Sequence, residues 1–343
     1  MKQCCAACIG DNHLRREIIP DLSKNTGACD YCGSFNQAVV LPETLRDSFE
    51  LVRGIYAQRE HGRPLLEWLM TDWGMFDNQT MGTERANELL ADILGDKNLV
   101  MGHFVPVSGE GESLARWQEF REELMHKNRY FPKTLPDLTR LRGLLEYLEA
   151  LPSEVASTLF RARLQEGPAP YGIDQMGPPP AELATNGRAS PAGIPYLYLA
   201  SEHETAISEL RPHTGDLVCV AEFSVRSGLR LADLRNPRKT ISPFTFSDEQ
   251  EVGLLRRDLE FLAMLGQELT RPVRPQSAHI EYLPSQYLCE FIKDSKFDGV
   301  MYRSSVGTGT NYALFNPLAA QIKSVVQRSV SRVTVELRPH RSA

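Results

Sequence analysis

The sequence has no long apolar run and no large excess of charge of one sign. None of its hydrophobic stretches approaches the roughly 20 residues that a membrane-spanning helix needs, and Met1 is followed by cysteines instead of a secretory signal. The formal net charge is −6 at pH 7, which gives no electrostatic basis for broad binding to nucleic acid or to an anionic membrane. We therefore expect a cytoplasmic protein with neither as a partner.

Nucleotide-binding loops of the common types are also missing. No Gly-x-Gly-x-x-Gly or Walker sequence follows an expected strand, which disfavours Rossmann and P-loop sites. With 42% hydrophobic and 24% charged residues, the composition is typical of a globular protein. A chain of 343 residues exceeds one ordinary hydrophobic core, so two or three structural units are expected.

Cysteine is scarce except at the N-terminus, where five of the seven cysteines lie within the first 32 residues. Four of these form two Cys-x-x-Cys pairs: Cys5 with Cys8, and Cys29 with Cys32. Two such turns each supply a pair of thiolates to one tetrahedral metal ion, which predicts a structural zinc site. Cys4 is an alternative to Cys5. We assign residues 1–40 to this zinc-binding segment.

Residues 41–152 are predicted to form an all-α domain. Apolar residues recur at helical spacing in four stretches: Thr44–Ala57, Glu84–Ile93, Ser113–Met125 and Leu138–Leu151. Within the third, Arg121 and His126 resemble the Arg-x4-6-His signature of HEPN-type ribonucleases. A solvated helical face explains the same two residues without a nuclease.

Residues 153–343 change to short β-type runs mixed with helices, which predicts a mixed α/β domain and an α+β class overall. Expected strands are Thr158–Ala162, Tyr196–Leu199, Leu217–Phe223, Leu229–Leu231, Gly299–Tyr302, Tyr312–Phe315 and Gln321–Val335. Expected helices are Glu202–Leu210, Asp248–Leu265 and Ser285–Lys293. Ser247 with Gln250, and Ser201 with Glu204, have the spacing of helix capping boxes.

Four short motifs in this domain place polar residues where packing alone does not require them. They are Phe160-Arg161-Ala162-Arg163, the loop from Gly187 to Pro195, the run from Ser201 to Arg211, and Tyr302-Arg303-Ser304-Ser305. In this order they resemble the RES domain family, named for its Arg, Glu and Ser. The resemblance extends from Leu159 to Pro317, and the zinc-plus-helical front more loosely resembles the HEPN-type extension of some members.

The resemblance implies an enzyme that consumes NAD. Characterised members are described as bacterial toxins that degrade NAD by hydrolysis or phosphorolysis, with a fold similar to diphtheria-type ADP-ribosyltransferases. Many are paired with an antitoxin protein that plugs the site, and members commonly form dimers. For this chain the resemblance therefore implies NAD as substrate, an antitoxin partner and a homodimer.

Carried over onto this chain, the family positions are Arg161, Arg188, Glu209 and Ser304. Arginine can bind a pyrophosphate bidentately, so Arg161 and Arg188 are the expected NAD anchors, although surface ion pairs would also explain them. Cleavage of the nicotinamide bond develops positive charge on the ribose, and Glu209 is the carboxylate expected to stabilise it unless it pairs with Arg211.

Ser304 is expected to hydrogen-bond the ribose or the nicotinamide amide, with Ser305 as the alternative and a turn serine as the structural explanation. Tyr198 or Tyr171 is expected to stack on the nicotinamide ring, although core packing also explains Tyr198. Ala189 departs from the family, because many members have an aromatic residue at this place.

The sequence is compatible with three functions. The first is NAD cleavage by a glycohydrolase or phosphorylase that acts as a toxin or defence effector. The second is transfer of ADP-ribose to a macromolecule. The third is an inactive RES cleft with RNA binding or cleavage by the helical front.

Overall fold

The computed structural model describes residues 1–77, 79–109 and 111–334, and these residues form two compact units. The first unit comprises residues 1–117 and 237–264, and the second comprises residues 118–236 and 265–343, of which residues 335–343 lie outside the described part. Each unit is built from two separate pieces of the chain. Residues 118–152, predicted to belong to the helical domain, group instead with the strands that follow them.

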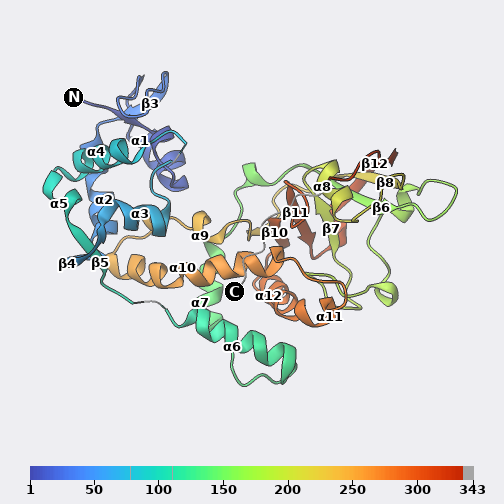
Figure 1. Cartoon of the computed structure of the whole chain (residues 1–343). Coiled ribbons are helices and arrows are strands. Elements are labelled where there is room, and N and C mark those ends of the chain that lie inside the picture. The colour runs from blue at the N-terminus through green and yellow to red at the C-terminus, as the bar shows by residue number, and fades with distance from the viewer. Residues whose placement is uncertain (78, 110, 335–343) are drawn as a thin grey trace. The chain divides into compact units, whose positions relative to one another are not determined.

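The first unit begins with a small sheet in the order β1-β3-β2, followed mainly by helices (Figure 1). Its strands are β1 (Cys4–Cys5), β2 (Asn25–Gly27), β3 (Gln37–Val40), β4 (Tyr56–Pro64) and β5 (His103–Pro106). Its helices are α1 (Ile19–Leu22), α2 (Arg46–Arg53), α3 (Leu65–Trp73), α4 (Thr83–Leu94), α5 (Lys97–Met101) and α9 (Pro237–Thr240). Short helical turns accompany them: η1 (Ala6–Cys8), η2 (Leu14–Ile18), η3 (Pro42–Leu45) and η7 (Pro243–Thr245).

The prediction of an all-α domain in residues 41–152 is wrong at one place. The helix expected over Thr44–Ala57 ends at Arg53, and β4 pairs antiparallel with β5. This pairing buries Tyr56 and Phe104, and the indole nitrogen of Trp68 donates a 2.7 Å hydrogen bond to the Phe104 carbonyl. Tertiary pairing between distant segments therefore overrides the local helical spacing.

Two helices contribute residues to both units. Helix α6 (Ser113–His126) and helix α10 (Glu249–Thr270) each begin in residues of the first unit and end in residues of the second. The carboxylate of Asp248 accepts a 2.9 Å hydrogen bond from the Glu251 amide at the start of α10, so Asp248 fills the capping role that was predicted for Ser247.

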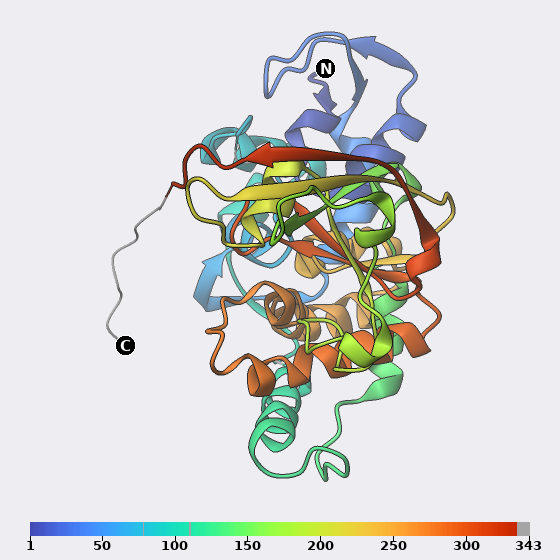
Figure 2. The same cartoon turned by 90° about the vertical axis from the view of Figure 1, so that its right-hand side faces the viewer.

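The second unit contains a mixed seven-stranded sheet in the order β12-β8-β6-β7-β11-β10-β9 within the described residues. Its strands are β6 (Thr158–Leu164), β7 (Leu197–Ala200), β8 (Leu217–Val225), β9 (Leu231–Asp233), β10 (Gly299–Arg303), β11 (Thr310–Leu314) and β12 (Ala320–Ser329). Figure 2 shows β12 in red lying along β8 in yellow at one edge. Neighbours pair antiparallel except for β9 with β10, so the mixed α/β prediction is confirmed.

Helices and turns surround this sheet: α7 (Leu138–Glu146), α8 (His203–Ser208), α11 (Ala278–Glu281), α12 (Leu283–Asp294), η4 (Pro152–Glu154), η5 (Ile173–Gln175), η6 (Ala181–Leu183) and η8 (Pro317–Ala319). Its main core combines residues such as Leu159, Leu199 and Phe223 from adjacent strands. Every expected strand is found with shifted ends, but β12 ends at Ser329, and Val335 lies outside the described residues.

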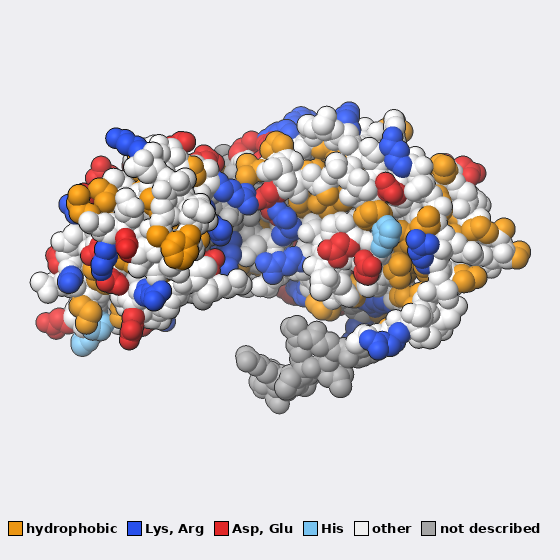
Figure 3. Space-filling model, turned by 90° about the horizontal axis from the view of Figure 1, so that it is seen from above, with side chains coloured by type: hydrophobic (Ala, Val, Ile, Leu, Met, Phe, Trp, Pro, Cys, Tyr) orange, Lys and Arg blue, Asp and Glu red, His pale blue; other side chains and the backbone are white. Residues whose placement is uncertain are grey.

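No helix in the described residues is both long and apolar enough to cross a membrane. The face drawn in Figure 3 carries acidic and basic side chains intermixed with apolar ones, as the small net charge leads one to expect.

Candidate active site

A cavity of about 580 Å³ opens in the second unit and brings together residues far apart in the sequence. Its volume lies within the range of roughly 300–1,000 Å³ that is usual for small-molecule sites. Polar side chains that line it are Arg161, Asn186, Arg188, Tyr198, Glu209, Arg211, Tyr282, Tyr302, Ser305 and Asn311. Three guanidinium groups and one carboxylate give the lining a positive balance, which suits an anionic ligand.

Arg161 projects from β6, which lies between β7 and β8 in the sheet. Its Nη1 donates a 3.3 Å hydrogen bond to the Tyr198 carbonyl, whereas its buried Nε has no partner among the described residues. Burial, and secondarily the neighbouring charge of Arg163, lowers the pKa of Arg161 to about 10. The group stays charged at neutral pH, and the described residues offer it no carboxylate, so an anion in the cavity would compensate it.

The loop that carries Arg188 is fixed by the hydroxyl of Tyr198. This oxygen accepts hydrogen bonds from the amides of Ala189 and Ser190, each at 3.0 Å. Gly187 is required beside it, because a Cβ there would lie 2.4 Å from the same oxygen. Burial raises the pKa of Tyr198 to about 12, so the hydroxyl remains neutral. Tyr198 therefore positions the loop, and its predicted stacking on nicotinamide stays a prediction.

The Arg188 side chain is held against the segment from residue 271 to residue 285. Its Nη1 donates a 2.7 Å hydrogen bond to the Arg271 carbonyl, and its guanidinium carbon lies 5.2 Å from the centre of the Tyr282 ring. The Ser285 hydroxyl donates a 2.6 Å hydrogen bond to the Arg188 carbonyl. Because Arg188 makes no ion pair among the described residues, the surface ion pair considered from the sequence is not observed.

Glu209 caps the C-terminus of α8 and lines the cavity. Its Oε1 accepts hydrogen bonds from the hydroxyl of Ser304 at 2.7 Å and from the amide nitrogen of Asn311 at 2.6 Å. The pairing with Arg211 is not observed in the described residues, and Arg211 adopts a left-handed backbone conformation with φ of 51°. The structure therefore holds the carboxylate by two neutral donors from the β10–β11 region.

Glu204, another carboxylate of the run from Ser201 to Arg211, is not held by the capping box that its spacing suggested. Helix α8 begins after Glu202, which makes no side-chain cap, and the Ser201 hydroxyl instead accepts a 2.9 Å hydrogen bond from the Thr310 amide. Both side chains are exposed, but Glu209 lines the cavity and Glu204 does not.

Ser304 takes part in the site through Glu209. Its hydroxyl also accepts hydrogen bonds from the amides of Val306 at 3.2 Å and Gly307 at 2.8 Å, as in a turn. Ser305, the alternative from the sequence, lines the cavity directly. Tyr171 does not line it, and its ring instead packs under the Arg163 guanidinium at 4.6 Å.

Asn186, Tyr282, Tyr302 and Asn311 line this cavity, although the sequence did not single them out as site residues. Tyr302 and Asn311 are both buried, and they lie opposite each other on paired strands. A buried asparagine needs hydrogen-bond partners, so its place beside Tyr312-Ala313-Leu314 was the available signal. The partner itself, Glu209, lies 102 residues away and was not readable from the pattern.

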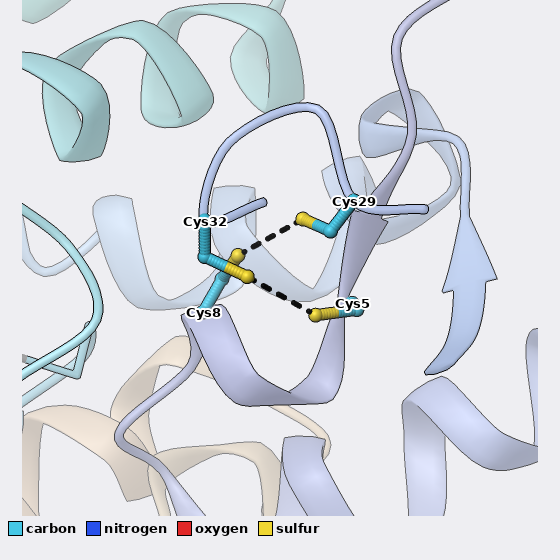
Figure 4. Close-up of side chains that lie close together, drawn as sticks. All are labelled: Cys5, Cys8, Cys29 and Cys32. Atoms are coloured by element: carbon cyan, nitrogen blue, oxygen red, sulfur yellow. Dashed lines mark hydrogen bonds between the residues drawn. The ribbon is translucent and has the colours of Figure 1, made fainter. Parts of the chain in front are cut away.

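The four predicted cysteines meet in the first unit (Figure 4). The sulfurs of Cys5, Cys8, Cys29 and Cys32 all lie within 4.8 Å of one another, with 3.4 Å between Cys8 and Cys29 and 3.6 Å between Cys5 and Cys32. Tetrahedral Zn–S bonds of about 2.3 Å imply sulfur separations of about 3.8 Å. The thiols of Cys5 and Cys8 lower the pKa of Cys29 by donating hydrogen bonds to its sulfur. The donor set therefore fits zinc.

Cys4 is buried but does not belong to this group of sulfurs. Burial raises the pKa of its thiol to about 12, which keeps it neutral. Cys5, not Cys4, completes the cluster.

Arg121 and His126 do not form a pair in α6. The Nε of Arg121 lies 3.3 Å from the carboxylate of buried Glu268, whereas His126 is exposed. Residues five apart on a helix are separated by about 140° around its axis. The arrangement explains Arg121 as a partner of Glu268 and leaves the ribonuclease hypothesis without a composite site.

One family model and one solved structure are similar to this chain. A family model described as RES domain matches residues 156–335, which is more than half of the chain. The crystal structure of the M. tuberculosis MbcT–MbcA toxin–antitoxin complex contains a similar chain, with 15% sequence identity, a TM-score of 0.33, and coverage of 56% of this chain and 93% of that chain. No curated protein matches the sequence.

Proposed function

This chain belongs to the RES domain family, and from that premise we propose that its cavity binds NAD and that the domain breaks the bond between nicotinamide and ribose. The observation that carries the proposal is the shared cavity itself. Arg161, Arg188 and Glu209 come from a strand, a loop and a helix end, yet all three line one space.

The two arginines would bind the pyrophosphate. Arg161 is poorly hydrated and lacks a carboxylate among the described residues, so a phosphate oxygen would satisfy its free Nε. Arg188 is held by the Arg271 carbonyl and by the Tyr282 ring, neither of which cancels its charge. Their fixed positions would orient the ribose that carries nicotinamide before the reaction begins.

Glu209 would act on the reacting ribose. Cleavage of the carbon–nitrogen bond leaves its electron pair on nicotinamide and positive charge on the ribose, which a fixed carboxylate stabilises. In hydrolysis, water supplies its oxygen to the ribose carbon and releases a proton, which yields ADP-ribose. In phosphorolysis, phosphate supplies the oxygen and yields phosphorylated ADP-ribose. Ser304 and Asn311 would hold the carboxylate in place.

The direct test is to incubate the purified full chain with NAD and to identify the products by mass spectrometry, with and without phosphate. We expect release of nicotinamide, and a loss of at least about 100-fold in Glu209→Gln with the fold retained by circular dichroism. Folded wild-type protein that leaves NAD intact in both buffers would contradict the proposal.

Two further assays separate the remaining functions. Radiolabel transferred from NAD to a macromolecule would indicate ADP-ribosyl transfer, whereas RNA cleavage that is lost in His126→Ala would indicate the ribonuclease alternative.

If NAD is consumed, expression in bacteria should stop growth, and a protein that occupies the cavity would be the expected antitoxin. Light scattering would show whether the purified chain forms the homodimer that the family resemblance implies.

A further inference from the structure

We propose that one apolar wall of the cavity receives the adenosine end of NAD. The wall consists of Leu269, Val273, Pro275, Ala278 and Tyr282, hereafter the adenosine wall. This inference rests on the proposed function, because it assumes that the cavity takes a dinucleotide. It assigns each end of the NAD molecule to one side of the cavity.

The adenosine wall is one continuous piece of chain. It begins in the last turn of α10, passes through the segment from residue 271 to residue 277, and ends where α11 meets α12. Leu269 and Val273 are buried, while Ala278 and Tyr282 are half-buried at the cavity. A planar base with two apolar faces suits such a surface, and aromatic rings are the usual platform for stacking a base.

The carboxylate belongs to a different wall. Glu209 follows α8, which lies on the opposite side of β7 from α11 in Figure 1. Its carboxylate is held by donors from the β10–β11 region, whereas the adenosine wall is connected to Arg188 through the Arg271 carbonyl and the Tyr282 ring. The cavity thus has a carboxylate side and an apolar side, with Arg188 held against the apolar one.

Charge decides which end of NAD lies at which side. Before cleavage the nicotinamide ring carries a positive charge, so it is attracted to Glu209 and repelled by the guanidinium of Arg188. Adenine is neutral and has no such conflict with an arginine 5.2 Å from the centre of the Tyr282 ring. The pyrophosphate between the two ends would then lie at Arg161 and Arg188, which leaves the adenosine wall for adenosine.

The test uses AMP, which contains the adenosine end without the reacting bond. Ala278→Leu adds bulk to the adenosine wall, keeps the Tyr282–Arg188 contact and suits a helix. Ala181→Leu, at an exposed position away from the cavity, is the matched control. We expect AMP to bind the wild type and Ala181→Leu equally, and at least about tenfold more weakly to Ala278→Leu. Equal affinity in all three proteins, or no AMP binding to the wild type, overturns the inference.

Turnover gives a second measurement. Nicotinamide mononucleotide has the reacting bond but no adenosine, so Ala278→Leu should raise the KM for NAD about tenfold and leave kcat/KM for the mononucleotide within about twofold. Equal losses with both substrates would overturn the adenosine assignment. A wild type that binds AMP at this wall but cleaves neither substrate would sink the proposed function alone, because the AMP measurement does not depend on catalysis.

Discussion

The amide nitrogen of Asn311 donates a 2.6 Å hydrogen bond to Oε1 of Glu209, the same oxygen that accepts from Ser304. Both bonds end on one oxygen, so they hold Oε1 in place while Oε2 is left without a donor from either residue. A carboxylate held in this way can meet developing positive charge without first losing a tight ion pair. Asn311 is therefore a positioning residue in the proposed reaction.

Replacing Asn311 should change catalysis more than folding. We expect Asn311→Ala to lower kcat about 10-fold to 100-fold with little change in KM, because Glu209 loses one of its two donors. Asn311→Asp is nearly the same size but places a second carboxylate beside the first, so the acid limb of the pH–rate profile should move to higher pH. If Asn311 had a merely structural role, both variants would have a lower kcat but an unchanged pH–rate profile.

Removing the charge of Arg161 should separate stability from activity. The lowered pKa, to about 10, means that folding opposes the charged form, so the cost is present at neutral pH and fades as the pH rises past this value. We expect Arg161→Met to leave the free energy of unfolding unchanged or to raise it by about 1 kcal/mol. The same substitution should abolish NAD cleavage.

Arg163→Met is the control for that substitution, because Arg163 lies on the same strand but packs over Tyr171 outside the cavity. Thermal unfolding and nicotinamide release should be measured on both variants. Full activity in Arg161→Met would remove this residue from the proposed site.

The hydroxyl of Tyr198 should affect substrate binding through the Arg188 loop. Tyr198→Phe leaves the amides of Ala189 and Ser190 without their acceptor, at a cost of about 1–3 kcal/mol. We expect the KM for NAD to rise about tenfold with a smaller change in kcat. Steady-state kinetics with Tyr196→Phe provide the comparison, because the buried Tyr196 hydroxyl has no partner among the described residues. Equal kinetics in the two variants would contradict the loop assignment.

The cysteine cluster makes a prediction about metal content. We expect the purified wild type to contain about one zinc per chain. Cys8→Ser removes one of the four ligands, so this variant should lose most of that zinc, and its first unit should unfold at a lower temperature. Cys4→Ser, which alters an equally buried thiol outside the cluster, should retain the metal. Elemental analysis of both proteins decides the matter, and zinc retained by Cys8→Ser at wild-type level would exclude the site.

Local patterns predicted the parts of this protein that depend on neighbours in sequence. The apolar run Leu217–Phe223 became β8, and the Cys-x-x-Cys spacings brought four sulfurs together, because each Cys-x-x-Cys turn is a local structure. The family motifs also led to Arg161, Arg188 and Glu209, which share a cavity although their roles stay predictions.

Features that depend on distant pairing were not predicted. The apolar spacing over Thr44–Ala57 suggested one helix, but β5 pairs with β4 and ends that helix early. Likewise, Asn311 can donate to Glu209 only because β11 pairs with β7 and β10, which brings the Asn311 amide to the carboxylate. The sequence predicted a helix over Asp248–Leu265, but it did not indicate which of the two units that helix would join.

The return of α10 to the first unit affects any attempt to isolate the part of the chain that matches the RES family. The chain leaves the first unit after Trp117, returns to it for residues 237–264, and then leaves it again. Those returning residues lie inside the segment matched by the family model. An expression fragment trimmed to that segment would therefore carry α10 without its partners in the first unit, such as Asp72, which pairs with Arg256 at 2.7 Å. Such a fragment should aggregate, whereas a single protease nick at residue 236 would leave both cores whole.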